Sequence, residues 1–108
     1  MPDHANSLEQ IERTIRDRFR EERRLFREVE DQFEERDLKE LVRYDAREID
    51  YAETFFLDHM TLQEPRTPVQ LARWMRYAVQ RLAIAVQRRK YWQRILATFG
   101  PAAILVAG

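Results

Sequence analysis

The sequence predicts an all-α protein built from long amphipathic helices, and three observations lead to this prediction. Residues that break helices are scarce and lie outside the long periodic stretches; they are Gly100, Gly108, Pro2, Pro65, Pro68 and Pro101. Good helix formers dominate the chain, chiefly Glu, Arg, Ala, Leu and Gln. Apolar residues recur in steps of three and four, which is the spacing of one helix face.

The first helix is expected at about 8–36, after a mobile lead-in at 1–7. Ser7 and Gln10 have the spacing of a capping box, which predicts a start at Leu8. One polar residue, Glu22, interrupts the apolar stripe, which consists of Leu8, Ile11, Ile15, Phe19, Phe26, Val29 and Phe33. Phe19, Phe26 and Phe33 are seven residues apart, so we expect them to form a seam that drives helix pairing.

The second helix is expected at about 38–60. The polar stretch 34–37 interrupts the stripe, and Asp37 with Glu40 forms another capping-box pattern, so a break followed by a new start at Leu38 is favoured. The alternative is one continuous helix from about 8 to 60. Two adjacent strips predict a wide buried face; they are Leu38, Val42, Asp45, Ile49, Ala52 and Phe56, and beside them Leu41, Tyr44, Tyr51 and Phe55.

The third helix is expected at 68–98, after an acidic helical segment at 8–62 and a loop at 63–67. Thr67 as N-cap and Pro68 at the first helical position mark its start, and Gly100-Pro101 stops it. Arg89 is the polar exception in its stripe, which consists of Leu71, Met75, Ala78, Leu82, Ala85, Trp92, Leu96 and Phe99. The tail at 99–108 is uncharged and apolar.

Charge divides the chain into two parts. Residues 1–64 contain 19 acidic and 11 basic residues, a net charge of −8, whereas residues 65–108 contain eight basic residues and no acidic one, a net charge of +8. We therefore expect the acidic part to pack against the basic helix as a long antiparallel hairpin or a three-helix bundle. Helices this long in 108 residues leave apolar surface uncovered, so we also expect an oligomer.

Catalysis is not expected. The chain has no cysteine, which excludes disulfides, thiolate nucleophiles and zinc–thiolate sites. Two glycines cannot build a glycine-rich phosphate loop, and the sole serine, Ser7, has no triad-like partners. We expect no enzyme activity and no cofactor. The first residues lack the pattern of a secretory signal, so the expected location is the cytoplasm, or the cytoplasmic face of a membrane.

A carboxylate-bridged metal site is the enzyme-class alternative, as in an oligomeric ferritin-like protein. The Glu-x-x-His motif of such proteins is absent, and the nearest substitute ligands are Glu22, Asp45, Glu48 and His59. Glu48 and His59 are roughly 16 Å apart along a helix axis, too far to share one ion within a chain. Structural hydrogen bonding or solvation of these side chains is the favoured interpretation.

The basic third helix has three interpretations. Its cations pair with the acidic helices or face solvent, which is the favoured interpretation; or they bind nucleic acid, for which no recognised module is present; or they approach a membrane. The membrane hypothesis rests on an anchor cluster followed by an apolar tail that can act as a buried plug. The cluster is Arg88, Arg89, Lys90, Tyr91 and Trp92, and the plug is Ile104, Leu105 and Val106.

These observations predict a non-enzymatic helical interaction or assembly protein. We expect an accessory subunit that docks on a protein partner, on another copy of itself or on a membrane surface, through the basic third helix and the apolar tail. A metal-binding oligomer and a nucleic-acid-binding helical protein are the two alternatives.

Overall fold

The computed structural model describes residues 4–60 and 67–99, and within these ranges the chain is helical, with no strand. The prediction of an all-α protein is therefore confirmed. The helices are α1 (His4–Gln32), α2 (Arg36–Asp45), α3 (Arg47–Asp58) and α4 (Pro68–Phe99).

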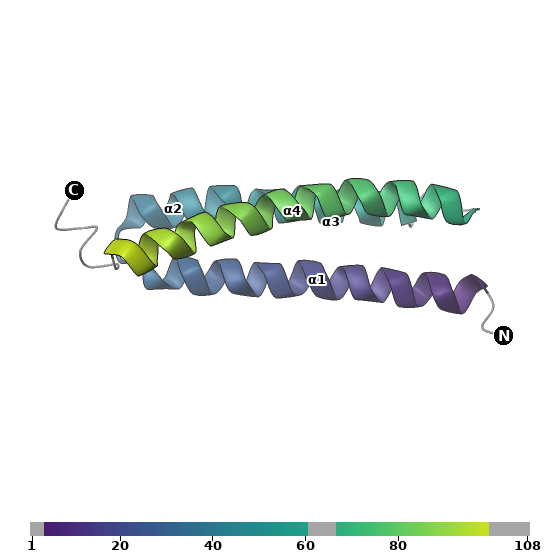
Figure 1. Cartoon of the computed structure of the whole chain (residues 1–108), viewed down its shortest axis with the longest axis horizontal. Coiled ribbons are helices and arrows are strands. Elements are labelled where there is room, and N and C mark those ends of the chain that lie inside the picture. Colours follow the sequence, from purple (N-terminus) through teal and green to yellow (C-terminus); the bar gives the residue numbers. More distant parts are fainter. Residues whose placement is uncertain (1–3, 61–66, 100–108) are drawn as a thin grey trace.

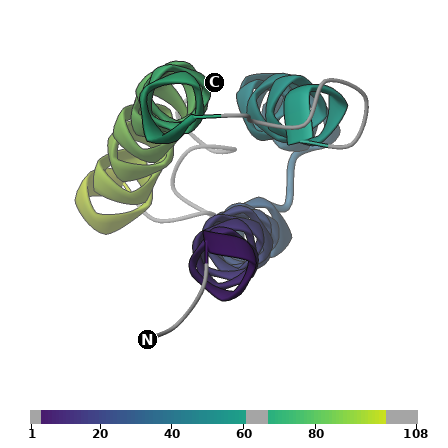
Figure 2. The same cartoon turned by 90° about the vertical axis from the view of Figure 1, so that its right-hand side faces the viewer.

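The helices form three rods, of which the first and third run in the same direction and the second is antiparallel to both. Rod one is α1, rod two is α2 followed by α3, and rod three is α4, which runs back beside α3 (Figure 1). Viewed along the rods, α3 and α4 lie side by side and α1 lies below the space between them (Figure 2). The molecule is elongated, with extents of 59 × 23 × 16 Å.

The break between the first and second rods lies earlier than predicted. Helix α1 begins at His4, so residues 4–7 of the predicted lead-in are helical, and it ends at Gln32 rather than near 36. The cap of α2 is Glu35, whose side chain accepts a hydrogen bond from the Leu38 backbone N–H at 2.9 Å. Asp37 is therefore not the cap; it lies in the first turn, where the helix dipole favours a carboxylate.

The second rod is not one regular helix, as the sequence prediction had it. Ala46 separates α2 from α3, although its backbone angles, φ −65° and ψ −14°, stay right-handed helical. The Ile49 N–H donates to the carbonyl of Ala46, three residues back, rather than four. Because the backbone tightens only locally, the rod continues after an interruption of one residue. No glycine or proline lies at this position, so the sequence does not predict the interruption.

The start of α4 agrees with the sequence prediction. Pro68 is its first residue, and the Thr67 hydroxyl accepts a hydrogen bond from the Gln70 backbone N–H at 3.2 Å. The helix ends at Phe99, one residue beyond the predicted end. Without an internal glycine or proline, α4 runs the whole length of the other two rods (Figure 1).

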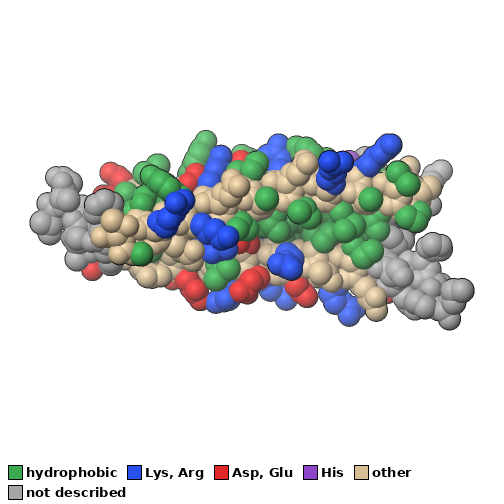
Figure 3. Space-filling model, in the orientation of Figure 1, with side chains coloured by type: hydrophobic (Ala, Val, Ile, Leu, Met, Phe, Trp, Pro, Cys, Tyr) green, Lys and Arg blue, Asp and Glu red, His purple; other side chains and the backbone are tan. Residues whose placement is uncertain are grey.

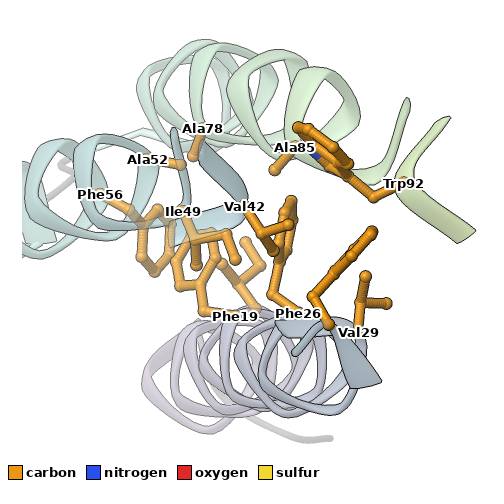
Figure 4. Close-up of a cluster of buried hydrophobic side chains, with 12 residues drawn as sticks. Phe19, Phe26, Val29, Val42, Ile49, Ala52, Phe56, Ala78, Ala85 and Trp92 are labelled. Carbon is orange, nitrogen blue, oxygen red and sulfur yellow. The ribbon is translucent and has the colours of Figure 1, made fainter. Parts of the chain in front are cut away.

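One hydrophobic core lies between the three rods (Figure 4). Phe19 and Phe26 of α1 are almost completely buried and point toward the other two rods, and Phe33, the residue directly after α1, is buried in the same core. The Phe19 ring meets Phe56 of α3 edge to face, with centroids 6.3 Å apart. On α4, small residues at the same heptad position, Ala78 and Ala85, let the helix approach α3 closely.

Ion pairs at the edge of the core join α1 to the second rod. Arg23 of α1 reaches Glu53 at 2.6 Å and Asp50 at 2.9 Å, both on α3. The hydrogen bond from Arg23 to Glu53, and then that to Asp50, raises the pKa of the Arg23 guanidinium. Some acidic side chains of the first two rods therefore pair with cations of these same rods, and only the other acidic side chains are available to α4.

The position of the α2 cap gives a test of this boundary. Glu35→Ala removes the side-chain acceptor for the Leu38 N–H and should lower the free energy of unfolding by about 1 kcal/mol. Asp37→Ala removes only a favourable interaction with the helix dipole and should lower it by a few tenths of a kcal/mol, about 0.3. Urea denaturation measures both values, and a larger loss for Asp37→Ala would place the cap where the sequence alone predicted it.

Candidate interaction surface

A buried ion pair crosses the core between α1 and α4. Arg89 Nη2 donates to Glu22 Oε1 at 3.0 Å and Arg89 Nε donates to Glu22 Oε2, so the guanidinium holds both carboxylate oxygens. The two side chains are 12% and 6% exposed. A third polar group completes the arrangement, because Arg89 Nη1 donates to Gln93 Oε1 at 3.0 Å. Glu22 and Arg89 are the polar exceptions in the apolar stripes of α1 and α4.

A second polar contact links α4 to α2 at the neighbouring level. The Trp92 indole N–H donates to Asp45 Oδ2 at 2.8 Å, while its ring packs edge to face on Phe33, the residue directly after α1, with centroids 5.6 Å apart. Just outside the core, the Glu48 carboxylate of α3 forms ion pairs with Arg88 at 3.3 Å and with Arg81 at 3.4 Å. Glu22, Asp45 and Glu48 thus each contact a donor on α4.

The four metal-ligand candidates are not brought together. Glu22, Asp45 and Glu48 are engaged by arginine or tryptophan side chains, as described above. His59 lies at the far end of α3, where its Nδ1 is 2.8 Å from the Phe55 carbonyl oxygen and its ring stacks on Phe55. Residues 4–60 and 67–99 contain no group of three or more histidine and acidic side chains that could hold a metal ion.

The predicted anchor cluster is divided between the interior and the surface. Arg89 and Trp92 point into the core, Arg88 reaches across to α3, and only Lys90 and Tyr91 are exposed. Five successive residues cover more than one helical turn, so they cannot all face one membrane surface. The plug residues Ile104, Leu105 and Val106 lie outside the described residues.

None of the described helices is long and apolar enough to cross a membrane.

A second row of large apolar and aromatic side chains runs along the outside of the second and third rods. We call it the outer row; its members are Leu41, Tyr44 and Tyr51 on α2 and α3, and Tyr77, Ile84 and Tyr91 on α4. All six are exposed, by 38% at Tyr77 to 60% at Tyr44. The sequence prediction that this strip is part of a wide buried face is therefore wrong for Leu41, Tyr44 and Tyr51, because the three rods bury only one seam per helix.

The exposure of the outer row indicates that its members lie where α1 does not cover the second and third rods. Figure 2 shows α3 and α4 side by side with α1 beneath them, so the outward side of this pair has no described helix on it. Tyr77, Ile84 and Tyr91 are spaced seven residues apart, as are Tyr44 and Tyr51. Heptad spacing keeps such side chains on one continuous line along the helix surface.

Ring and ion contacts hold the central part of the outer row in place. Phe55 stacks on Tyr77 with centroids 4.1 Å apart, and Arg81 lies over the rings of Tyr51 and Tyr77 at 5.7 and 5.2 Å. The Tyr77 hydroxyl accepts a hydrogen bond from Arg81 Nε at 2.9 Å and raises the pKa of the Arg81 guanidinium, and Glu48 adds to this effect. These side chains line an open groove of about 670 Å³.

The two sides of this groove differ in charge. Helix α4 has seven basic residues and no acidic one, whereas α3 has four acidic residues and one basic residue. Four exposed cations of α4 take part in none of the ion pairs found among the described residues; they are Arg73, Arg76, Lys90 and Arg94. Cationic side chains are spread along α4 in Figure 3, and hydrophobic ones reach the upper edge, where α3 and α4 lie.

Comparisons with protein-family models, with curated proteins and with solved structures find no match to this chain.

The buried pair had a signal in the sequence. Glu22 and Arg89 are single polar residues of opposite charge in otherwise apolar stripes, and such exceptions can be satisfied by meeting each other. Arg89 and Trp92 also lie at positions of the α4 stripe, and this pattern predicts that they face the core and not the surface. The outer row had a weaker signal, because a strip next to the seam can be either buried or exposed until the number of rods is known.

Adjacent residues of α4 test the division of the anchor cluster. Trp92→Ala should lower the free energy of unfolding by about 3–5 kcal/mol, because it empties a core position between three rods. Tyr91→Ala should change it by no more than about 0.5 kcal/mol, since the side chain is exposed. Thermal denaturation of dilute protein compares them, and equal losses would show that residues 88–92 act as one unit.

Proposed function

We propose that this protein is a non-enzymatic interaction module, a three-helix bundle that docks a helical partner in the groove between α3 and α4. The outer row is the observation that carries the proposal. The interior seams already supply a hydrophobic core with contributions from all the described helices, so the outer row is not needed to complete that core.

The physical argument starts from the exposure of the outer row. Contiguous apolar and aromatic surface is unfavourable in water and is typical of a binding site. Its heptad spacing matches the way helices pair, and tyrosine supplies large contact area with few rotatable bonds. A helix laid along the groove would contact both sides of the outer row, as amphipathic helices do in other grooves.

The proposal shifts the docking surface away from the predicted anchor cluster. Tyr91 is common to both surfaces, whereas Arg89 and Trp92 serve the core. The apolar tail at 99–108, whose first residue is the last of α4, stays in the proposal as an additional contact with the partner or with a membrane surface. A cytoplasmic location, the expectation from the sequence, is part of the same proposal.

The carboxylates support a non-catalytic function. Glu22 is held by a bidentate guanidinium in the core, Asp45 accepts the Trp92 N–H, and Glu48 lies between two arginines. Each contact joins a carboxylate of the first or second rod to α4. We therefore propose that they align the rods.

Site-specific photo-crosslinking tests the docking surface. A photoreactive phenylalanine analogue at Ile84, in cells that make the protein, should give one discrete crosslinked species, because this position lies at the centre of the outer row. The same analogue at Asp17, which is exposed on α1, should give none. Crosslinks of equal yield from both positions, or none from position 84, would contradict the proposal.

A further inference from the structure

We propose that the occupant of the groove is a second copy of this chain, related to the first by a two-fold axis parallel to the long axis of the rods. This inference rests on the proposed function and specifies its partner. In this arrangement, α3 of each copy lies on α4 of the other, and the four helices close a second seam formed by the two outer rows.

Charge selects this axis. A two-fold axis parallel to the rods exchanges the two sides of the groove, so the acidic helix α3 meets the partner's basic helix α4, and the reverse contact forms with it. A two-fold axis across the rods would instead place α4 on α4, with seven basic residues and no acidic residue on each. Like charges in an interface are strongly unfavourable, whereas opposite charges favour association.

Helix direction agrees with the same axis. Rotation about the long axis leaves the direction of every helix unchanged, so the partner's α3 runs antiparallel to α4, as α3 does within one copy (Figure 1). All neighbouring helices around the new seam are then antiparallel, which is the arrangement of up-down helical bundles. Such an interface is isologous and closes at two copies.

The contacts within one copy predict which side chains meet across the interface. Phe55 lies level with Tyr77, and His59 with Trp74, at centroid distances of 4.1 and 5.1 Å. Asp58 and Arg73 each precede a member of the second pair by one residue. Because α3 and α4 are antiparallel, these two positions are separated by two residues, about 3 Å along the axis, which an arginine side chain can span. Both are exposed and have no ion pair among the described residues. Because the rotation preserves level, Asp58 should face the partner's Arg73.

Sedimentation equilibrium with charge-reversal variants tests this inference. The wild-type protein should sediment at twice its 13.2 kDa chain mass. Asp58→Arg and Arg73→Asp should each raise the dissociation constant at least about tenfold, because the dimer contains every clash twice. The double variant, which restores opposite charges, should return to near the wild-type value. Asp17→Arg, on exposed α1, is the matched control and should leave the dissociation constant unchanged.

An apolar variant tests the interface independently of charge. Ile84→Glu places a carboxylate in the centre of the new seam and should give a monomer with an unchanged helical circular dichroism spectrum. A dimer that persists in this variant would place the interface elsewhere and overturn the inference. Single reversals that weaken the dimer without rescue in the double variant would exclude the axis parallel to the rods.

The remaining outcomes separate this inference from the proposed function. A wild-type protein that stays monomeric, together with a crosslink from position 84 to a different protein, overturns the second copy as occupant and leaves the docking groove supported. A monomer that dimerises only after removal of residues 100–108 shows that the chain's own tail fills the groove, which also overturns the inference. Absence of both dimer and crosslink overturns both proposals.

Discussion

The buried pair of Glu22 and Arg89 is the interaction on which the alignment of the rods depends. Charges removed from water are unfavourable unless a partner of opposite charge holds them, so α4 must place Arg89 level with Glu22. A shift of α4 by one heptad would bring Leu82 or Leu96 to that level and leave both charges unpaired in the core. Apolar seams alone would permit such a shift, because every heptad offers them a similar surface.

The outward face of the molecule follows from this alignment. Once Arg89 and Trp92 point inward, the helical period turns Ile84 and Tyr91 outward beside α3, and Arg81 reaches Glu48 at the rim. The interior pair therefore decides which side chains are available to a partner. The opposite charges of α3 and α4 then make the exposed groove complementary to itself, which is the basis for proposing a second copy as its occupant.

Much of the helical structure was predictable from the sequence, because the local signals are strong there. The scarcity of helix-breaking residues and the apolar stripes predict the all-α fold class, and Thr67 with Pro68 predicts the start of α4. Glu35 as cap and the interruption at Ala46 were not predictable, since both depend on how the rods meet and not on local propensity. Adjacency in the sequence groups Arg89 and Trp92 with Lys90 and Tyr91, whereas their positions around the helix place Arg89 and Trp92 in the core. The dimer and the docking groove stay predictions.

A double-mutant cycle on the buried pair is the most direct measurement of the central claim. Glu22→Leu and Arg89→Leu should each lower the free energy of unfolding by about 3–5 kcal/mol, because each leaves one charge buried without its partner. The double variant should recover most of that loss, since leucine matches the surrounding seam. Losses below about 1 kcal/mol for both single variants, the value of an exposed ion pair, would contradict the account.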